Sequence, residues 1–91
     1  MATLQLTAQR KSDALAVLNN TNVIFLYNEY ANKASLKASL TGAGDTDNIN
    51  CSVAELELLK AKIPAYKPGL TEEQLTNVEE LEVAVQASID A

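Results

Sequence analysis

The 91-residue sequence contains no histidine, no tryptophan and a single cysteine, Cys51. Histidine is the commonest general base and, together with cysteine, the usual ligand of structural zinc. Their scarcity excludes the common catalytic triads and a structural zinc site within one chain. One cysteine also excludes an internal disulfide bond. We therefore expect a protein that is not an enzyme and that needs no cofactor.

Aromatic residues and long apolar runs are also scarce. One phenylalanine and three tyrosines are the only aromatic residues, so the core must be built from aliphatic side chains. The longest strongly apolar run, residues 23–27, is far shorter than the roughly 20 residues of a membrane-spanning helix. The N-terminal residues lack the basic and apolar blocks of a secretion signal. We expect a soluble, single-domain protein over residues 1–91, made in the cytoplasm and without membrane contact.

The charge of the chain is distributed unevenly. The net charge is −5, but residues 1–40 hold four basic and two acidic residues, whereas residues 41–91 hold three basic and ten acidic ones. This division favours head-to-tail docking of copies or a basic partner for the C-terminal half. A solvated acidic face that aids solubility is the simpler alternative. Nucleic-acid binding needs a concentrated basic surface, so we expect none.

Two capping boxes mark helix starts in the C-terminal half, at residues 52–55 and 71–74. Each precedes a helical apolar pattern. We predict one helix from about Val53 to Lys62, ended by Pro64, and a second from about Glu72 to Ile89. The short connection between them predicts a helical hairpin.

The last predicted helix is amphipathic, with one apolar and one acidic face. The apolar face consists of Leu75, Val78, Leu81, Val85 and Ile89. The opposite face holds Glu72, Glu79, Glu80 and Asp90. Val83 is an apolar exception among these acids.

The N-terminal half supports two interpretations. Thr7 or Ser12 could cap a first helix, after which the Asn-rich residues 19–22 form either a break or a polar patch. Residues 23–40 favour a helix that ends at Gly42 and Gly44. Its predicted inner face consists of Val23, Leu26, Tyr27, Tyr30, Ala31, Ala34 and Ala38. The alternative is a strand over residues 23–27 paired with residues 3–7.

These elements predict a mainly α fold, a small bundle of three to four helices closed by the C-terminal hairpin. Residues 1–7 form a possible short β arm, and residues 41–51 form a loop. Asp45 and Asp47 in this loop resemble the first positions of a calcium loop, but the later positions depart from that pattern. Turn formation explains them better. Cys51 is expected to be a small apolar residue packed under the loop.

Several large apolar residues fall on the predicted solvent side of their helices. They suggest a second buried face that contacts a partner, unless the helices are placed incorrectly. These interaction candidates are Phe25, Leu36, Leu40, Leu58 and Val83.

The leading hypothesis is a non-enzymatic structural or interaction protein that self-associates as a homo-oligomer or docks on a larger assembly. A small component of a virus particle or similar shell would fit this character. Residues 3–7 could then add a strand to a neighbour. The alternative is an acidic regulator that binds a basic protein surface through Glu72, Glu79 and Glu80 of the last helix.

Overall fold

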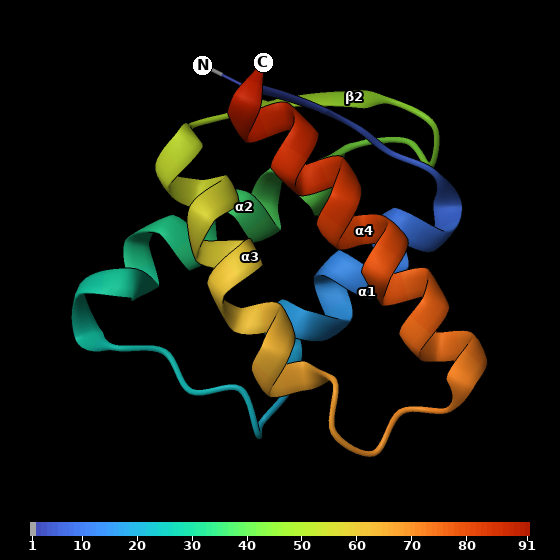
Figure 1. Cartoon of the computed structure of the whole chain (residues 1–91). Coiled ribbons are helices and arrows are strands. Elements are labelled where there is room, and N and C mark those ends of the chain that lie inside the picture. Colours follow the sequence, from blue (N-terminus) through green and yellow to red (C-terminus); the bar gives the residue numbers. More distant parts are fainter. Residues whose placement is uncertain (1) are drawn as a thin grey trace.

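A computed structural model of the chain describes residues 2–91 (Figure 1). Over these residues the chain forms four α-helices, a short 3-10 helix and a two-stranded antiparallel sheet. The predicted fold class, a small helical bundle with a short N-terminal β segment, is confirmed. The elements in chain order are β1 (Ala2–Gln5), α1 (Ala8–Asn19), η1 (Tyr27–Glu29), α2 (Tyr30–Gly42), β2 (Asn48–Cys51), α3 (Val53–Tyr66) and α4 (Glu72–Asp90).

The helices pack around one aliphatic core. α3 and α4 lie side by side as the predicted hairpin, α1 packs against both, and α2 packs against α1 and α3 (Figure 1). The sheet covers one end of the bundle, where β1 contacts α4. Among residues 2–91, every helix is too short or too polar to span a lipid bilayer.

A side-chain hydrogen bond marks the start of the first helix, and another closes the turn that follows its end. The Thr7 hydroxyl accepts a hydrogen bond from the Arg10 amide at 3.1 Å, so this threonine is the N-cap. At the other end, the Asn20 side chain accepts from the Asn22 amide at 2.8 Å. Of the two interpretations of the Asn-rich run, the break is confirmed. The residues buried by α1 are Ala14, Val17 and Leu18.

Both predictions for residues 23–27 are wrong. Residues 23–26 belong to no helix or strand, and helical structure resumes only at Tyr27. Val23 and Phe25 are buried, whereas Ile24 and Leu26 between them point to solvent. The segment therefore alternates as a strand does, but its inner side chains fill the core without a neighbouring strand.

The later start of the second long helix changes which of its faces is buried. α2 begins at Tyr30, and its buried residues are Leu36 and Leu40. Ala34 and Ala38, which the predicted inner face contained, are exposed. That predicted face is wrong because it assumed one continuous helical periodicity from residue 23, which the extended segment interrupts.

The strand that pairs with β1 lies inside the predicted loop. β2 runs antiparallel to β1, with Leu4 opposite Ile49 and Thr3 opposite Asn50. Leu4 and Ile49 are buried, and the Thr3 hydroxyl donates to the Asn50 side-chain carbonyl at 3.0 Å. The loop prediction for residues 48–51 is wrong, as is the pairing of the N-terminal segment with residues 23–27. The strand forms because Ile49 and Cys51 alternate with polar residues, which lets both side chains enter the core.

Proline and glycine residues shape the connection between α3 and α4. α3 continues one turn beyond its predicted end, through Pro64 to the half-buried Tyr66, which packs against the core. A proline in the last turn removes a single backbone donor, and the packing of that turn offsets this loss. Gly69, at φ +85°, follows Pro68 in a tight turn that suits a residue without a Cβ. α4 then begins with a complete capping box between Thr71 and Gln74.

Candidate functional site

Four of the predicted contact residues belong to the core of the chain itself. Phe25, Leu36, Leu40 and Leu58 are all buried, so their predicted position on the solvent side is wrong. Leu36 and Leu40 lie on the buried face of α2, which differs from the face that the sequence predicted. Leu58 is buried because α3 packs against three other helices and therefore has more than one inner face.

Val83 is exposed as predicted, and it lies within an acidic stripe on α4. Val83 is 70% exposed to solvent, although its side chain is aliphatic. Val83 lines three shallow hollows of 370–430 Å³, one of which lies between β1 and the C-terminal half of α4. We call the stripe the acidic surface; it consists of Glu72, Glu73, Glu79, Glu80 and Val83, all exposed.

A second exposed surface was missed by the sequence reasoning. Tyr27 is 94% exposed, Ile24 76% and Leu26 62%, all within one short segment. A strand-like alternation from Val23 to Leu26 was the signal in the sequence that could have located it. We call this region the aromatic–basic surface; it consists of Ile24, Leu26, Tyr27, Tyr30, Lys33 and Lys37.

The exposed apolar segment is held on an anchored backbone. The Phe25 ring is buried beneath the Lys33 and Lys62 ammonium groups, which lie 4.6 and 5.2 Å from its centroid. The Glu29 carboxylate accepts from the Leu26 amide at 2.7 Å and pairs with Lys62 at 3.0 Å. The backbone hydrogen bond first, and Lys62 second, hold the pKa of the Glu29 carboxyl below its usual value. These contacts fix the positions from which the apolar side chains project.

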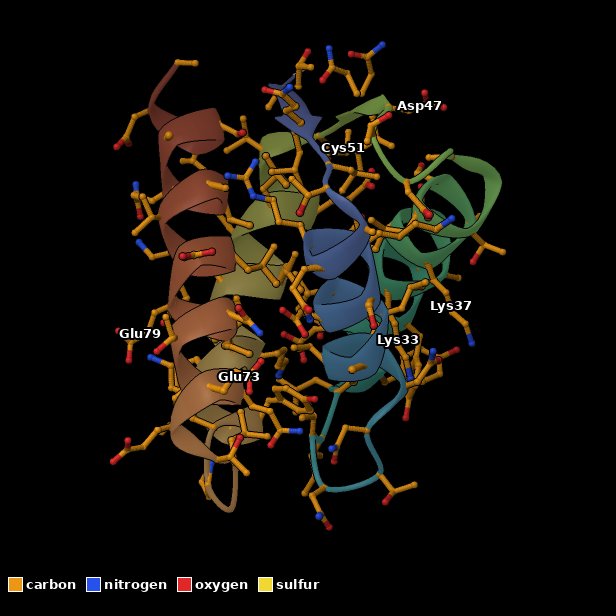
Figure 2. The ribbon with its side chains drawn as sticks, turned by 90° about the vertical axis from the view of Figure 1, so that its right-hand side faces the viewer. Lys33, Lys37, Asp47, Cys51, Glu73 and Glu79 are labelled. Atoms are coloured by element: carbon orange, nitrogen blue, oxygen red, sulfur yellow. The ribbon has the colours of Figure 1, made fainter. Side chains whose placement is uncertain are left out.

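The two surfaces carry charge of opposite sign that the chain does not neutralise. Within residues 2–91, ion pairs join Lys11 to Asp45, Lys62 to Glu29 and Lys67 to Glu82. In that part of the chain, no carboxylate lies within 4 Å of the Lys33 or Lys37 ammonium. The four acids of the acidic surface likewise have no lysine or arginine partner among the described residues. Figure 2 shows Lys33 and Lys37 on one side of the bundle and Glu73 and Glu79 on the other.

The two loop aspartates have structural partners. The Asp47 carboxylate accepts from the Gly44 amide at 2.8 Å, which closes the turn before β2, as the turn interpretation predicted. The Asp45 carboxylate lies 3.7 Å from the Lys11 ammonium. Within residues 2–91, no group of three or more cysteine, aspartate or glutamate side chains is arranged to hold a metal ion.

Cys51 is buried at the end of β2, as predicted for a small apolar residue. Burial, and secondarily the nearby Glu55 carboxylate, raise the pKa of the Cys51 thiol to about 11. Glu55 is itself buried, and it accepts hydrogen bonds from the Ser52 and Ser35 hydroxyls at 3.2 and 3.5 Å. This environment disfavours the thiolate, which is the nucleophilic form of cysteine.

We therefore expect native Cys51 to react very slowly with a thiol-reactive disulfide reagent. At pH 8, a pKa of about 11 leaves only about 0.1% thiolate, against roughly 25% for an unperturbed thiol. The native protein should react at least about 100-fold more slowly than the protein unfolded in guanidinium. Absorbance of the released thiol gives both rates, and fast native labelling at pH 8 would contradict the assignment.

No known protein family, curated protein or solved structure matches the chain. The functional argument therefore rests on the two surfaces.

Proposed function

We propose that this protein acts by contact, as a structural component that binds further copies of itself. The observation that supports this function is the aromatic–basic surface. Soluble monomers rarely expose contiguous apolar patches of large side chains, and such patches usually mark interaction sites. Here four large apolar side chains project from one anchored segment of residues 24–30.

The composition of this surface resembles the centre of a protein–protein interface. Tyrosine is enriched at such interfaces because its ring buries a large apolar area while its hydroxyl keeps a polar partner. Tyr27 and Tyr30 provide two such rings, and the Lys33 ammonium lies 5.6 Å from the centroid of the Tyr30 ring. A contact that buries these rings would serve a homo-oligomer, and equally a shell of repeated copies such as a virus particle.

The acidic surface supports a second candidate function, an acidic regulator that binds a basic protein. Glu72, Glu79 and Glu80 are exposed and have no basic partner among residues 2–91. Binding through exposed charges alone would be strongly weakened by salt, because the ions screen interactions beyond about 8–10 Å. Burial of apolar area is not weakened in this way.

The mass in solution tests the proposed function. Light scattering of the wild-type chain should give a mass above 9.8 kDa that rises with protein concentration and persists in part at high salt. Tyr27→Ser should lower this mass. Asn48→Ser, at an exposed position on β2 at the other end of the bundle, should leave it unchanged.

A monomer at every concentration and salt would contradict self-association. Capture of the chain by a basic protein at low salt only, and lost on neutralising Glu79 and Glu80, would then support the acidic regulator.

A further inference from the structure

The aromatic–basic surface and the acidic surface face away from each other. α1 and α3 lie between α2, which carries Lys33 and Lys37, and α4, which carries the acids. Figure 2 shows the labelled lysines and the labelled Glu73 and Glu79 on opposite sides of the molecule. One copy can therefore use both surfaces at the same time.

The two surfaces carry opposite charges, and each also exposes at least one large apolar side chain. On the aromatic–basic surface, the Lys33 ammonium lies 5.6 Å from the centroid of the exposed Tyr30 ring, and Lys37 follows one turn later on α2. Neither lysine has an acidic partner among residues 2–91. On the acidic surface, Glu79 and Glu80 line one shallow hollow with the exposed Val83 and with Arg10, but neither carboxylate forms an ion pair within 4 Å among residues 2–91. Pairing the two surfaces would bury apolar side chains centrally and surround them with opposite charges, the usual arrangement of an interface core and rim.

We infer that the aromatic–basic surface of one copy docks on the acidic surface of a second copy. This inference rests on the proposed self-association and specifies its geometry. The contact is head-to-tail, so an open assembly keeps one free surface of each kind, one at each of its two ends. Contacts of this kind close into a ring or continue as an open chain of copies.

A two-fold contact between identical surfaces is disfavoured by charge. It would place Lys33 and Lys37 of one copy against the same lysines of the other, or the acids of α4 against themselves. Like charges brought together at an interface are repulsive and select against that pairing. Only the mixed contact neutralises both sets of charges.

Two single variants block one surface each. Tyr27→Asp places a carboxylate in the aromatic–basic surface, and Val83→Asp adds one to the acidic surface. Both side chains are exposed, so neither change opens a cavity in the core. Because both substitutions add negative charge, the two blocked surfaces repel each other and cannot form a substitute contact.

Mixing these variants distinguishes the head-to-tail contact from other contacts. Each variant alone should be monomeric at concentrations where the wild type associates, which corresponds to at least about tenfold weaker self-association. An equimolar mixture should form a particle of two chains and no larger, twice the 9.8-kDa chain, because each variant retains the surface that the other needs. The control Asn48→Asp adds the same charge outside both surfaces and should associate as the wild type does. Circular dichroism verifies that all three variants keep the native helicity.

Three results would overturn the inference. A mixture that stays monomeric while the wild type associates would exclude the head-to-tail contact and leave self-association standing. A variant that alone keeps the wild-type mass would show that its surface is not part of the contact. A wild type that is monomeric at every concentration would exclude both the contact and self-association.

Discussion

Replacing Leu4 with alanine is expected to lower the free energy of unfolding by about 2–5 kcal/mol. Leu4 lies on β1, is completely buried opposite Ile49, and belongs to the core that the sheet shares with the helices. The substitution removes apolar area from the core and leaves a cavity that the surrounding helices fill only partly. Since a small domain has roughly 5–15 kcal/mol of stability in total, this loss is large. Chemical denaturation followed by circular dichroism measures it.

Thr3→Ala is the matched control on the same strand. Thr3 is exposed, and the change removes only its hydrogen bond to Asn50, for which we expect a loss of no more than about 1 kcal/mol. If Leu4→Ala instead left stability intact and abolished self-association, β1 would be an arm that pairs with a neighbour. The pairing of β1 with β2 in one chain and the burial of Leu4 argue for the core assignment.

The C-terminal hairpin could be predicted from the sequence because its signals are local. Two hydroxyl residues, Ser52 and Thr71, accept hydrogen bonds from amides three positions later, and a periodic apolar stripe follows each. The pairing of β1 with β2 joins residues 47 positions apart, such as Thr3 and Asn50. No local pattern specifies a contact at that separation, and both strands are only four residues long. The pairing of these two strands therefore could not be predicted from the periodicity of apolar residues.

Of the two candidate surfaces, the acidic one could be predicted from local sequence signals and the aromatic–basic one could not. Val83 and the acids of α4 could be predicted because the start of that helix was correct, so each residue fell on the right face. The position of the aromatic–basic surface depends on two features. One is the direction that the chain takes after the turn at Asn20, and the other is the packing of Phe25 beneath Lys33 and Lys62. Two of these four residues, Lys33 on α2 and Lys62 on α3, belong to helices that follow the exposed segment. Tertiary packing decided which side chains project.

The contrast between the buried Leu36 of α2 and the exposed Tyr27 of η1 gives the second large expected effect. Leu36→Ala should destabilise the protein by about 2–5 kcal/mol, because Leu36 is completely buried where α2 meets the core. Tyr27→Ala should change the free energy of unfolding by no more than about 0.5 kcal/mol, because this side chain is 94% exposed. Unfolding in denaturant, measured for both variants at a concentration where the protein is monomeric, gives the comparison.

The opposite ranking would restore the face predicted from periodicity, with the tyrosines inside and Leu36 outside. Measuring self-association of the same two variants separates folding from contact. Tyr27→Ala should keep its stability and lose association, because its ring contributes to a surface and not to the core. Leu36→Ala should lose stability, and at temperatures where it remains folded it should associate as the wild type does, because a completely buried side chain contributes no surface to a partner.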